Sequence, residues 1–445
     1  MNVKAKPVVV VGLGKTGYSV VAFFAARNIH VVGMDTREAP PFAQMIQQHF
    51  PEVTLHLGGL NQAHLLSAEK IILSPGLPLA TPEIQSSIDA GITVVSDIQV
   101  FADHAKAPIV AITGSNAKST VTSLLGVMAQ QAGLKVAVGG NLGTPALDLI
   151  EDDVDLYVME LSSFQLEATP NLNAKVATVL NISPDHLDRY DSYEAYYLSK
   201  HVIFNGCQWG VVNLDDALSK PQLKQPEHQV SFSLGTPQEN AFGVIKDAGQ
   251  LFLAKGETQL LNCDTLKMKG SHNRSNALAA LALGECAGLD MNSMLETLQT
   301  FPGLEHRCQW VGEHEGVDFY NDSKGTNVGA TLAALEGLGP EIKGHLVLMA
   351  GGVSKDADFN FLHDCVNRYV KTLVVYGQDQ QQIAEALNDV TQVISASSFE
   401  DAFNKACKCA TSNDTVLLSP ACASFDMFNS FEHRGETFVK LVEAL

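Results

Sequence analysis

The sequence PIVAITGSNAKST, residues 108–120, decides the fold of this chain. Its first half is apolar and β-branched, which predicts a buried strand that ends at Thr113. A polar loop follows, and a helical pattern then runs to about Gly133. Loops between a strand and a helix bind anions well, because the free N–H groups of the helix N-terminus point at the ligand. The stretch therefore predicts a parallel α/β unit with a phosphate site at its loop.

The side chains of this loop suit a nucleoside triphosphate. Backbone N–H groups can wrap the phosphates, Lys118 can reach the terminal oxygens, and the hydroxyl of Ser119 or Thr120 can face Mg²⁺. The match to the common pattern G-x-x-x-x-G-K-[ST] is incomplete, since Ile112 and Ala117 stand at its glycine positions. The strand–helix context still favours a triphosphate loop over a chance match.

A second glycine-rich loop lies near the N-terminus. Residues 12–17 read GLGKTG and fit G-x-G-x-x-G after an apolar strand, and Asp35 ends the next strand about 20 residues later. This pattern is typical of a dinucleotide site with the acid on a ribose, and it also occurs as a tight turn without a ligand. The acid is unusual in standing beside Arg37 at the strand end. Two phosphate loops argue against a simple dehydrogenase, which needs only one.

Strand and helix patterns alternate in three blocks, which predicts an α/β protein with three domains. We expect an N-terminal Rossmann-like domain over 1–97, a central P-loop-type ATPase domain over 98–302 and a C-terminal Rossmann-like domain over 303–445. Residues 228–262 contain short strands with turns, so a small antiparallel β patch is expected in the central domain. The other strands are expected at 7–11, 30–34, 71–73, 94–97, 108–113, 135–138, 156–160, 175–180, 209–213, 316–320, 345–349, 372–376 and 415–418.

Polar side chains follow the strands of the central block. Glu160 ends the strand LYVME, where an acid beside a phosphate loop can hold Mg²⁺, although a surface acid fits equally well. NISPDHLDRY, residues 181–190, follows the next strand and places His186 on the same rim as a candidate ligand or base. Lys200 lies on a helix that follows, and read alone it is a solvated lysine.

Three polar clusters follow strands of the last block, at residues 321–327 (NDSKGTN), 351–355 (GGVSK) and 419–426 (SPACASFD). Open α/β sheets bind ligands at the carboxyl ends of their strands, and these basic, hydroxyl and glycine groups suit a small acidic substrate. Each cluster by itself also fits a capped helix start.

The composition limits the class of protein. The 445 residues are 46% hydrophobic and 18% charged, as in ordinary globular chains. The net charge of −20 argues against nucleic acid or an anionic membrane as a general partner. The N-terminal apolar run is short and ends in glycines, and no stretch is long enough for a membrane span. We therefore expect a cytoplasmic location without membrane insertion, with the eight cysteines reduced.

Together these motifs resemble the Mur ligase family of peptidoglycan precursor synthesis, in the same order and over nearly the whole chain. The motifs are GLGKTG with DTR, SPG at 74–76, TGSNAKST, GGN at 139–141, MELSSFQLE, NISPDHLDRY, GSHNRSN, GLEHR, NDSKGTN and LSPACASFDMFNSFEHRG. The resemblance implies a UDP-binding, an ATPase and an amino-acid-binding domain in that order. It implies a ligase that uses ATP and Mg²⁺ to join D-glutamate to UDP-N-acetylmuramoyl-L-alanine.

The resemblance also implies site residues. Those for the UDP-linked substrate are Gly14, Lys15, Thr16, Asp35, Thr36, Arg37, Gly76 and Asn141. Those for ATP are Gly114, Ser115, Asn116, Ala117, Lys118, Ser119, Thr120, Asn273, Arg307, Asp322 and Lys324. Those for D-glutamate are Thr326, Lys355, Ser424, Phe425 and Phe431. Those for catalysis and two Mg²⁺ ions are Lys118, Ser119, Thr120, Glu160, His186 and Lys200, the last as a carbamate.

The mechanism implied by the resemblance is phosphoryl transfer followed by acyl transfer. The alanyl carboxylate attacks the γ-phosphate of ATP, and the D-glutamate amine then attacks the resulting acyl phosphate. Two positions depart from the family pattern. Ala117 replaces the glycine common before the loop lysine, and Val353 lacks the acid often seen before Lys355.

Other interpretations fit less of the sequence. A sister ligase for another amino acid, or a folylpolyglutamate synthase, fits the C-terminal clusters and the N-terminal UDP motif poorly. A nicotinamide-dependent dehydrogenase leaves the loop at 113–120 unexplained. A catalytically silent nucleotide-binding protein would not need Lys118, Glu160 and His186 together. We expect a monomer.

Overall fold

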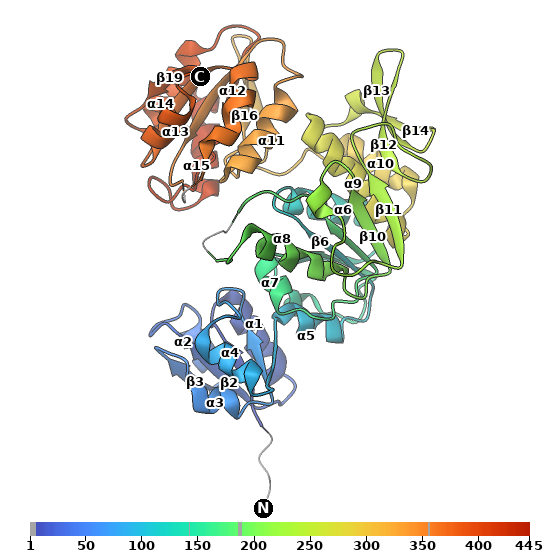
Figure 1. Ribbon diagram of the computed structural model, residues 1–445, viewed down its shortest axis with the longest axis vertical. Helices are drawn as coiled ribbons and strands as arrows, with labels where there is room; N and C mark the ends of the chain where they lie inside the picture. Colours follow the sequence, from blue (N-terminus) through green and yellow to red (C-terminus); the bar gives the residue numbers. More distant parts are fainter. Residues whose placement is uncertain (1–5, 142, 186–188, 355–356) are drawn as a thin grey trace, which may run out of the picture. The chain divides into compact units, whose positions relative to one another are not determined.

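The computed structural model (Figure 1) describes residues 6–141, 143–185, 189–354 and 357–445. The chain forms two compact units. The first unit holds the chain up to Ile245 together with Leu253–Leu260 and Leu278–Thr297. The second holds Lys246–Phe252, Leu261–Ala277 and Leu298–Leu445. None of the described helices is long and apolar enough to cross a membrane.

The first sheet has five parallel strands in the order β3-β2-β1-β4-β5. They are β1 (Val8–Val11), β2 (Val31–Asp35), β3 (Thr54–Leu57), β4 (Lys70–Leu73) and β5 (Thr93–Val95). The helices are α1 (Lys15–Ala25), α2 (Ala43–His49), α3 (Gln62–Leu66), α4 (Pro82–Asp89) and α5 (Asp97–His104). The valines of β1 are all buried, as in a parallel strand covered on both faces. The strand order reverses at β1, and ligands bind at such reversals in open α/β sheets.

The central sheet has nine strands in the order β14-β13-β12-β11-β10-β9-β6-β8-β7. They are β6 (Ile109–Thr113), β7 (Val136–Gly140), β8 (Leu156–Glu160), β9 (Val176–Val179), β10 (Trp209–Asn213), β11 (His228–Phe232), β12 (Phe242–Asp247), β13 (Gln250–Lys255) and β14 (Thr258–Asn262). The helices are α6 (Lys118–Gln131), α7 (Ser163–Glu167), α8 (Tyr193–His201), α9 (Ser271–Ala287) and α10 (Met291–Thr300).

Two expectations for strands need correction. The strand at His228–Phe232 is not antiparallel, because β11 pairs in parallel with β10. The antiparallel patch begins after it: Ala248 and Gly249 alone connect β12 to β13, and only antiparallel neighbours can be joined by so short a link. The strand expected at 94–97 ends earlier, since Asp97 begins α5 after the N-cap Ser96.

The third sheet has six strands in the order β15-β16-β20-β17-β18-β19. They are β15 (Gln309–His314), β16 (Val317–Asn321), β17 (Leu346–Gly351), β18 (Val370–Tyr376), β19 (Gln392–Ser395) and β20 (Thr415–Leu418). The helices are α11 (Val328–Leu338), α12 (His363–Tyr369), α13 (Gln380–Leu387), α14 (Phe399–Cys409) and α15 (Phe431–Glu443). Only the edge strand β15 is antiparallel to its neighbour, so this sheet is doubly wound as expected.

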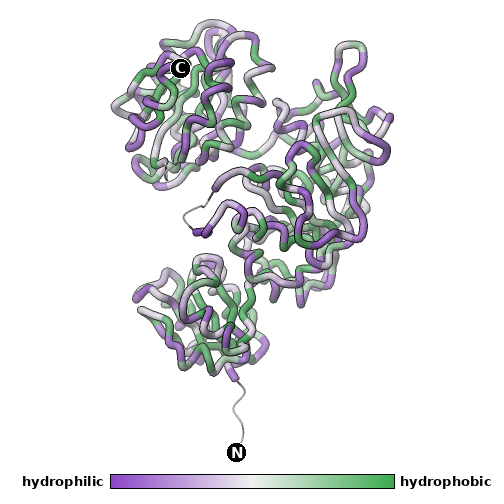
Figure 2. The backbone as a smooth tube through the Cα atoms, in the orientation of Figure 1, coloured by the Kyte–Doolittle hydropathy of each residue, from purple (hydrophilic) through white to green (hydrophobic). Residues whose placement is uncertain are grey.

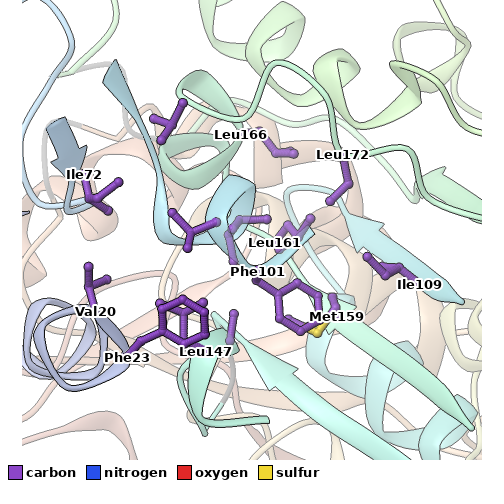
Figure 3. Packing of buried hydrophobic residues seen from close by; sticks show 14 of the residues in the cluster. Val20, Phe23, Ile72, Phe101, Ile109, Leu147, Met159, Leu161, Leu166 and Leu172 are labelled. Carbon is purple, nitrogen blue, oxygen red and sulfur yellow. The ribbon is translucent and has the colours of Figure 1, made fainter. Parts of the chain in front are cut away.

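A cluster of buried apolar side chains runs from the first sheet into the central sheet. Val20 and Phe23 of α1 belong to the same cluster as Phe101 of α5 (Figure 3). Leu147 of the short helix η1 (Ala146–Leu149) and Met159 of β8 continue it. Figure 2 shows apolar stretches inside each part of the chain, while many outer turns are polar. Burial of this shared surface stabilises the two sheets as one unit.

Candidate functional site

The phosphate loop connects β6 to α6, and its backbone accepts hydrogen bonds from the lysine of the same loop. Lys118 Nζ donates to the carbonyl oxygens of Gly114 at 2.8 Å and Ser115 at 3.0 Å. Ala117, just before α6, has φ 65° and ψ −3°, in the left-handed region. The first N–H groups of an α-helix have no partner inside the helix, so the start of α6 offers donors to an anion.

The segment after β9 holds this loop in shape. Ser115 N donates to the Asn181 carbonyl oxygen at 2.9 Å, and Asn116 N donates to Asn181 Oδ1 at 2.8 Å. Asn181 Nδ2 donates back to the Asn116 carbonyl oxygen at 3.1 Å, and Ser183 N donates to Ser115 Oγ at 2.9 Å. The phosphate loop and the start of NISPDHLDRY are therefore one hydrogen-bonded unit.

Glu160 is a buried acid beside this loop and is not a surface residue, since it is 2% exposed. It pairs with Ile112 in β6 on one side and with Gly140 in β7 on the other. Its Oε1 accepts from Asn141 Nδ2 at 2.6 Å, while its Oε2 is buried without a hydrogen-bond partner among the described residues. A buried carboxylate oxygen left unpaired is unfavourable unless a cation or donor is bound, so Glu160 fits a Mg²⁺ ligand.

Two hydroxyls of the phosphate loop are suited to the same ion. Ser119 and Thr120 lie in the first turn of α6 and are buried, at 6% and 5% exposed. No group of three or more His, Cys, Asp or Glu side chains forms a metal site among the described residues. Mg²⁺ commonly takes one or two carboxylates and completes its shell with water and phosphate oxygens, so this set still fits.

Lys200 is buried, which corrects its interpretation as a solvated lysine. It is 2% exposed on α8, and its Nζ donates to the Gly114 carbonyl oxygen at 3.2 Å, the same oxygen that accepts from Lys118. Burial, together with the charge of Lys118, holds the pKa of Lys200 well below its usual range, although Asp185 opposes this. The ring of Tyr196 lies 4.8 Å from Nζ, and its hydroxyl bonds Ser115 Oγ at 2.9 Å. Sequence reasoning missed Tyr196, although its spacing from Lys200 on the helix is a signal.

Asp35 organises the N-terminal loop. Its Oδ2 accepts from Leu13 N at 2.7 Å and from Arg37 Nη2 at 2.7 Å, and its Oδ1 accepts from Arg37 N at 2.9 Å and Nε at 2.8 Å. Burial by itself raises the pKa of Asp35, but these hydrogen bonds outweigh it and lower the pKa. With both oxygens engaged, the carboxylate orients Arg37 and the loop backbone instead of standing open to a ribose.

The glycines of GLGKTG have different tasks. A Cβ on Gly17 would lie 2.0 Å from the Gly12 carbonyl oxygen, so packing requires a glycine there, whereas a Cβ on Gly14 would meet nothing within 4 Å. Gly14 is the N-cap of α1 and provides no side-chain cap. Lys15 Nζ donates to the carbonyl oxygen of Gly143, which follows Asn141 by two positions, at 2.7 Å. Thr16 is half-buried, whereas Thr36 and Gly76 are exposed.

In the second unit, Asp322 lies at the carboxyl end of β16. Its Oδ2 accepts from Ser419 Oγ at 2.7 Å and its Oδ1 from Cys308 N at 3.1 Å. Burial raises the pKa of Asp322 to about 7. Lys324 Nζ lies 3.8 Å from the centre of the Phe431 ring. Lys324 is expected to bind ATP and Phe431 to bind D-glutamate, so this contact places the two predicted sets side by side.

The other residues expected in this unit are placed as follows. Asn273 on α9 is buried and donates to the Lys269 carbonyl oxygen at 2.8 Å. Thr326 N donates to the Lys324 carbonyl oxygen at 2.7 Å. Arg307 is half-buried, Ser424 is buried, and Phe425 is 72% exposed. An apolar ring this exposed is available to a ligand or a neighbouring surface.

Arg434 on α15 is a buried cation that sequence reasoning missed, although it lies in the last motif. Its guanidinium donates to Ser323 Oγ at 3.0 Å and the Ser323 carbonyl oxygen at 2.8 Å, and to the Cys422 carbonyl oxygen at 3.2 Å. A weaker bond reaches the Gly351 carbonyl oxygen at 3.4 Å. Arg434 thus ties together three strand-end loops, the clusters that the sequence predicts for a small acidic substrate.

Two residues of the predicted site, His186 and Lys355, lie outside the described residues. The eight cysteines are all unbridged, which fits reduced thiols.

Comparisons with known proteins cover nearly all of the chain. Residues 6–96 match "Mur ligase MurD-like, N-terminal domain", residues 112–284 "Mur ligase middle domain" and residues 306–422 "Mur ligase, glutamate ligase domain". Proteins of Pseudomonas fluorescens (strain Pf0-1) and Pseudomonas aeruginosa, both described as UDP-N-acetylmuramoylalanine–D-glutamate ligase, are 53% and 52% identical to it. Each alignment covers 98% of this chain and 98% of the relative.

Solved structures share the fold at low sequence identity. A pseudomurein peptide ligase type C from Methanothermus fervidus has a TM-score of 0.62 at 18% identity and covers 99% of each chain. MurF from Acinetobacter baumannii has a TM-score of 0.63 at 16% identity and covers 99% of this chain and 92% of its own.

Proposed function

Because this chain belongs to the Mur ligase family, we propose that its two phosphate loops serve one reaction, the ATP-dependent joining of D-glutamate to UDP-N-acetylmuramoyl-L-alanine. The bond formed is an amide between the alanyl carboxyl group and the amine of D-glutamate, in peptidoglycan synthesis. The observation that carries the site assignment is the arrangement at Gly114, whose carbonyl oxygen accepts from both Lys118 and Lys200. The strand before this loop, β6, pairs with β8, which ends at Glu160 and its unpaired Oε2.

The phosphate loop performs the first step. The alanyl carboxylate attacks the γ-phosphate of ATP, and the product is an acyl phosphate with ADP as leaving group. A free carboxylate is a poor acyl donor, which is why ATP is needed. Lys118 and the N–H groups at the start of α6 offset the repulsion between the two anions and stabilise charge that develops on the phosphate. Asn181 keeps those donors in place through its bonds to Ser115 and Asn116.

The residues proposed to hold Mg²⁺ are Glu160, Ser119, Thr120, His186 and Lys200, the last as a carbamate. Bound there, the ion neutralises phosphate charge and polarises the phosphoryl oxygens. Asn141 orients Glu160 through its bond to Oε1 at 2.6 Å, and Oε2, which has no hydrogen-bond partner among the described residues, would be the oxygen that holds the ion.

The proposed carbamate on Lys200 draws support from its surroundings. Carbamylation requires a neutral amine, and burial beside Lys118 favours the neutral form of Lys200. The neutral amine forms a bond between Nζ and the carbon of CO₂ and releases one proton, so that a neutral group becomes an anionic carbamate. The carbamate anion then compensates the positive charge of Lys118 and can help position the metal.

The second step takes place with D-glutamate held by the C-terminal clusters. Thr326, Lys355, Ser424, Phe425 and Phe431 are proposed for this amino acid, and Asn273, Arg307, Asp322 and Lys324 for ATP. The amine attacks the acyl carbonyl carbon, a tetrahedral intermediate forms, and phosphate leaves. Arg434 fixes the positions of the three loops relative to one another and does not itself contact the substrate.

The UDP end of the acceptor is proposed to bind the GLGKTG loop. Gly14 leaves open space at the N-terminus of α1, and the helix N-terminus suits a diphosphate. Arg37, oriented by Asp35, and the neighbouring Thr36 offer donors beside it. Lys15, Thr16, Gly76 and Asn141 complete the proposed set.

The same proposal includes a monomeric state, a cytoplasmic location and three domains with limits of 1–97, 98–302 and 303–445.

The experiment that tests this function measures phosphate release from ATP with UDP-N-acetylmuramoyl-L-alanine and one of three amino acids. We expect turnover with D-glutamate and little with L-glutamate or L-alanine. Equal turnover with L-alanine, or none with D-glutamate, contradicts the proposal. Size-exclusion chromatography with light scattering on the same sample checks the monomer.

A further inference from the structure

Arg189 joins two loops at the carboxyl ends of different sheets in the first unit. Its Nη1 donates to the Pro75 carbonyl oxygen at 2.5 Å and its Nη2 to the Leu77 carbonyl oxygen at 3.2 Å. Both acceptors lie in the loop after β4, whereas Arg189 follows β9 in the segment that begins at Asn181. The Arg189 side chain is only 13% exposed, so water competes little for these bonds.

A platform on α7 holds the guanidinium of Arg189 from a second direction. Its Cζ lies 3.9 Å from the centre of the Phe164 ring, and its Nη2 lies 3.5 Å from Glu167 Oε2. Phe164 stacks on Tyr190, whose hydroxyl donates to Glu167. This platform belongs to the central part of the chain, because α7 follows β8, the strand that ends at Glu160.

The loop after β4, which accepts the hydrogen bonds from Arg189, forms one side of the proposed UDP site. Ser74 N donates to the Val11 carbonyl oxygen at 2.9 Å, and a Cβ on Gly12 would lie 2.5 Å from Ser74 Cβ. The loop after β4 therefore lies directly against GLGKTG. A shift of this loop moves the UDP end of the substrate relative to its reacting carboxylate.

We propose that Arg189 is a positioning residue that fixes the loop after β4 relative to the phosphate loop. In this way Arg189 determines whether the UDP-linked substrate binds in a productive position. This inference rests on the proposed function. Two carbonyl oxygens on one loop, a carboxylate and an aromatic face match a planar guanidinium with several fixed donors. A lysine ammonium is a compact charge and cannot reproduce this set.

Arg189→Lys tests the proposal. We expect the KM for UDP-N-acetylmuramoyl-L-alanine to rise about tenfold, because hydrogen bonds from a charged donor are lost. The KM for ATP is expected to change less than about twofold, since no bond to the phosphate loop itself is removed. Glu167→Gln removes the ion pair with Arg189 and weakens the hydrogen bond from Tyr190, but it keeps both bonds from Arg189 to the loop after β4. It should therefore raise the KM for UDP-N-acetylmuramoyl-L-alanine by a smaller factor.

Arg27→Lys is the matched control. Arg27 also lies over an aromatic ring, 3.5 Å from the centre of Phe23, and donates to the Phe23 carbonyl oxygen at 2.9 Å. Both of these contacts are local to the end of α1, so neither KM should change. A second test uses Arg189→Ala with added guanidinium ion, which should lower the raised KM for the UDP-linked substrate, whereas methylammonium should not.

The outcomes separate this inference from the proposed function. An unchanged KM for the UDP-linked substrate in Arg189→Lys overturns the inference. So does an equal rise of both KM values together with a lower melting temperature, because that result indicates a general loss of stability. If the unaltered enzyme fails to use D-glutamate, the proposed function fails instead. The increase in melting temperature caused by the UDP-linked substrate, compared between Arg189→Lys and the unaltered chain, then still decides the role of Arg189.

Discussion

At the residue scale, Ala117 has an unfavourable backbone conformation at the centre of the phosphate loop. Its φ of 65° lies in the left-handed region, where an L-residue with a Cβ is disfavoured by about 1–2 kcal/mol. Ala117→Gly removes that strain but gives the unfolded chain more freedom, which costs about 0.4–1 kcal/mol. We expect a net gain of about 0.5–1 kcal/mol in the free energy of unfolding, measured by denaturant titration.

Ala384→Gly is the control for this change. Ala384 lies inside α13, where glycine is unfavourable by about 1 kcal/mol relative to alanine. This variant should therefore lose stability. A loss of similar size in Ala117→Gly would show that the loop does not strain Ala117.

A second prediction at this scale concerns Lys200. We expect Lys200→Ala to lose most activity and added short carboxylic acids to restore part of it, because an acid in the vacated space replaces the carbamate anion. Lys118→Ala should lose nearly all turnover without such rescue, since its missing group is a cation. The assay is phosphate release with and without the acid. Turnover of Lys200→Ala at the unaltered rate without additives would contradict the carbamate.

At the scale of elements, α5 carries a buried acid at its first residue. Asp97 is 2% exposed, its Oδ1 has no hydrogen-bond partner within the described ranges, and burial raises its pKa to about 7. An acid whose folded pKa is raised favours folding below its unfolded pKa of 3.8, and this contribution is lost as pH rises through about 7. Each pKa unit is worth about 1.4 kcal/mol, so the loss is at most about 4 kcal/mol.

We therefore expect the free energy of unfolding to fall between about pH 4 and pH 8, and Asp97→Asn to flatten this fall. Denaturant titration across that range measures both. Asp103→Asn on the same helix is the control and should keep the slope of the unaltered protein, because Asp103 is exposed. An unchanged slope in Asp97→Asn would place the titrating group elsewhere.

At the scale of the whole molecule, the two glycine-rich loops lie on two different sheets, and we propose that they bind two different nucleotides. The oxygens of Asp35 already accept from Leu13 and Arg37, so its carboxylate is not open to a ribose diol as in a nicotinamide site. We expect calorimetric titration to detect UDP but neither NAD nor NADP. Tight binding of NAD with none for UDP would reverse the assignment of this loop. Lys118→Ala should keep UDP binding, which separates the two loops.

Much of the fold is predictable from short patterns. The strands at 156–160, 209–213 and 415–418 have the predicted bounds, because short, largely apolar runs mark buried parallel strands. The edge strand β15 and the short strands β3 and β19 were not predicted, since they are partly exposed and their apolar pattern is broken. The parallel pairing of β11 depends on which neighbour it meets, and a single strand carries no signal for that choice.

The sequence by itself determined the two glycine-rich loops, the strand–loop–helix unit around Lys118, the acid at the end of β8 and the doubly wound character of the blocks. These features depend on residues close together in the chain, where backbone geometry and side-chain periodicity act directly. Only the tertiary structure decided that Lys200 is buried against Gly114, that Asn181 locks the phosphate loop across 65 residues, and that Arg189 reaches Pro75 across 114 residues. The physical reason is that hydrogen bonding and burial depend on which loops meet at the sheet edges. Local patterns do not specify those meetings.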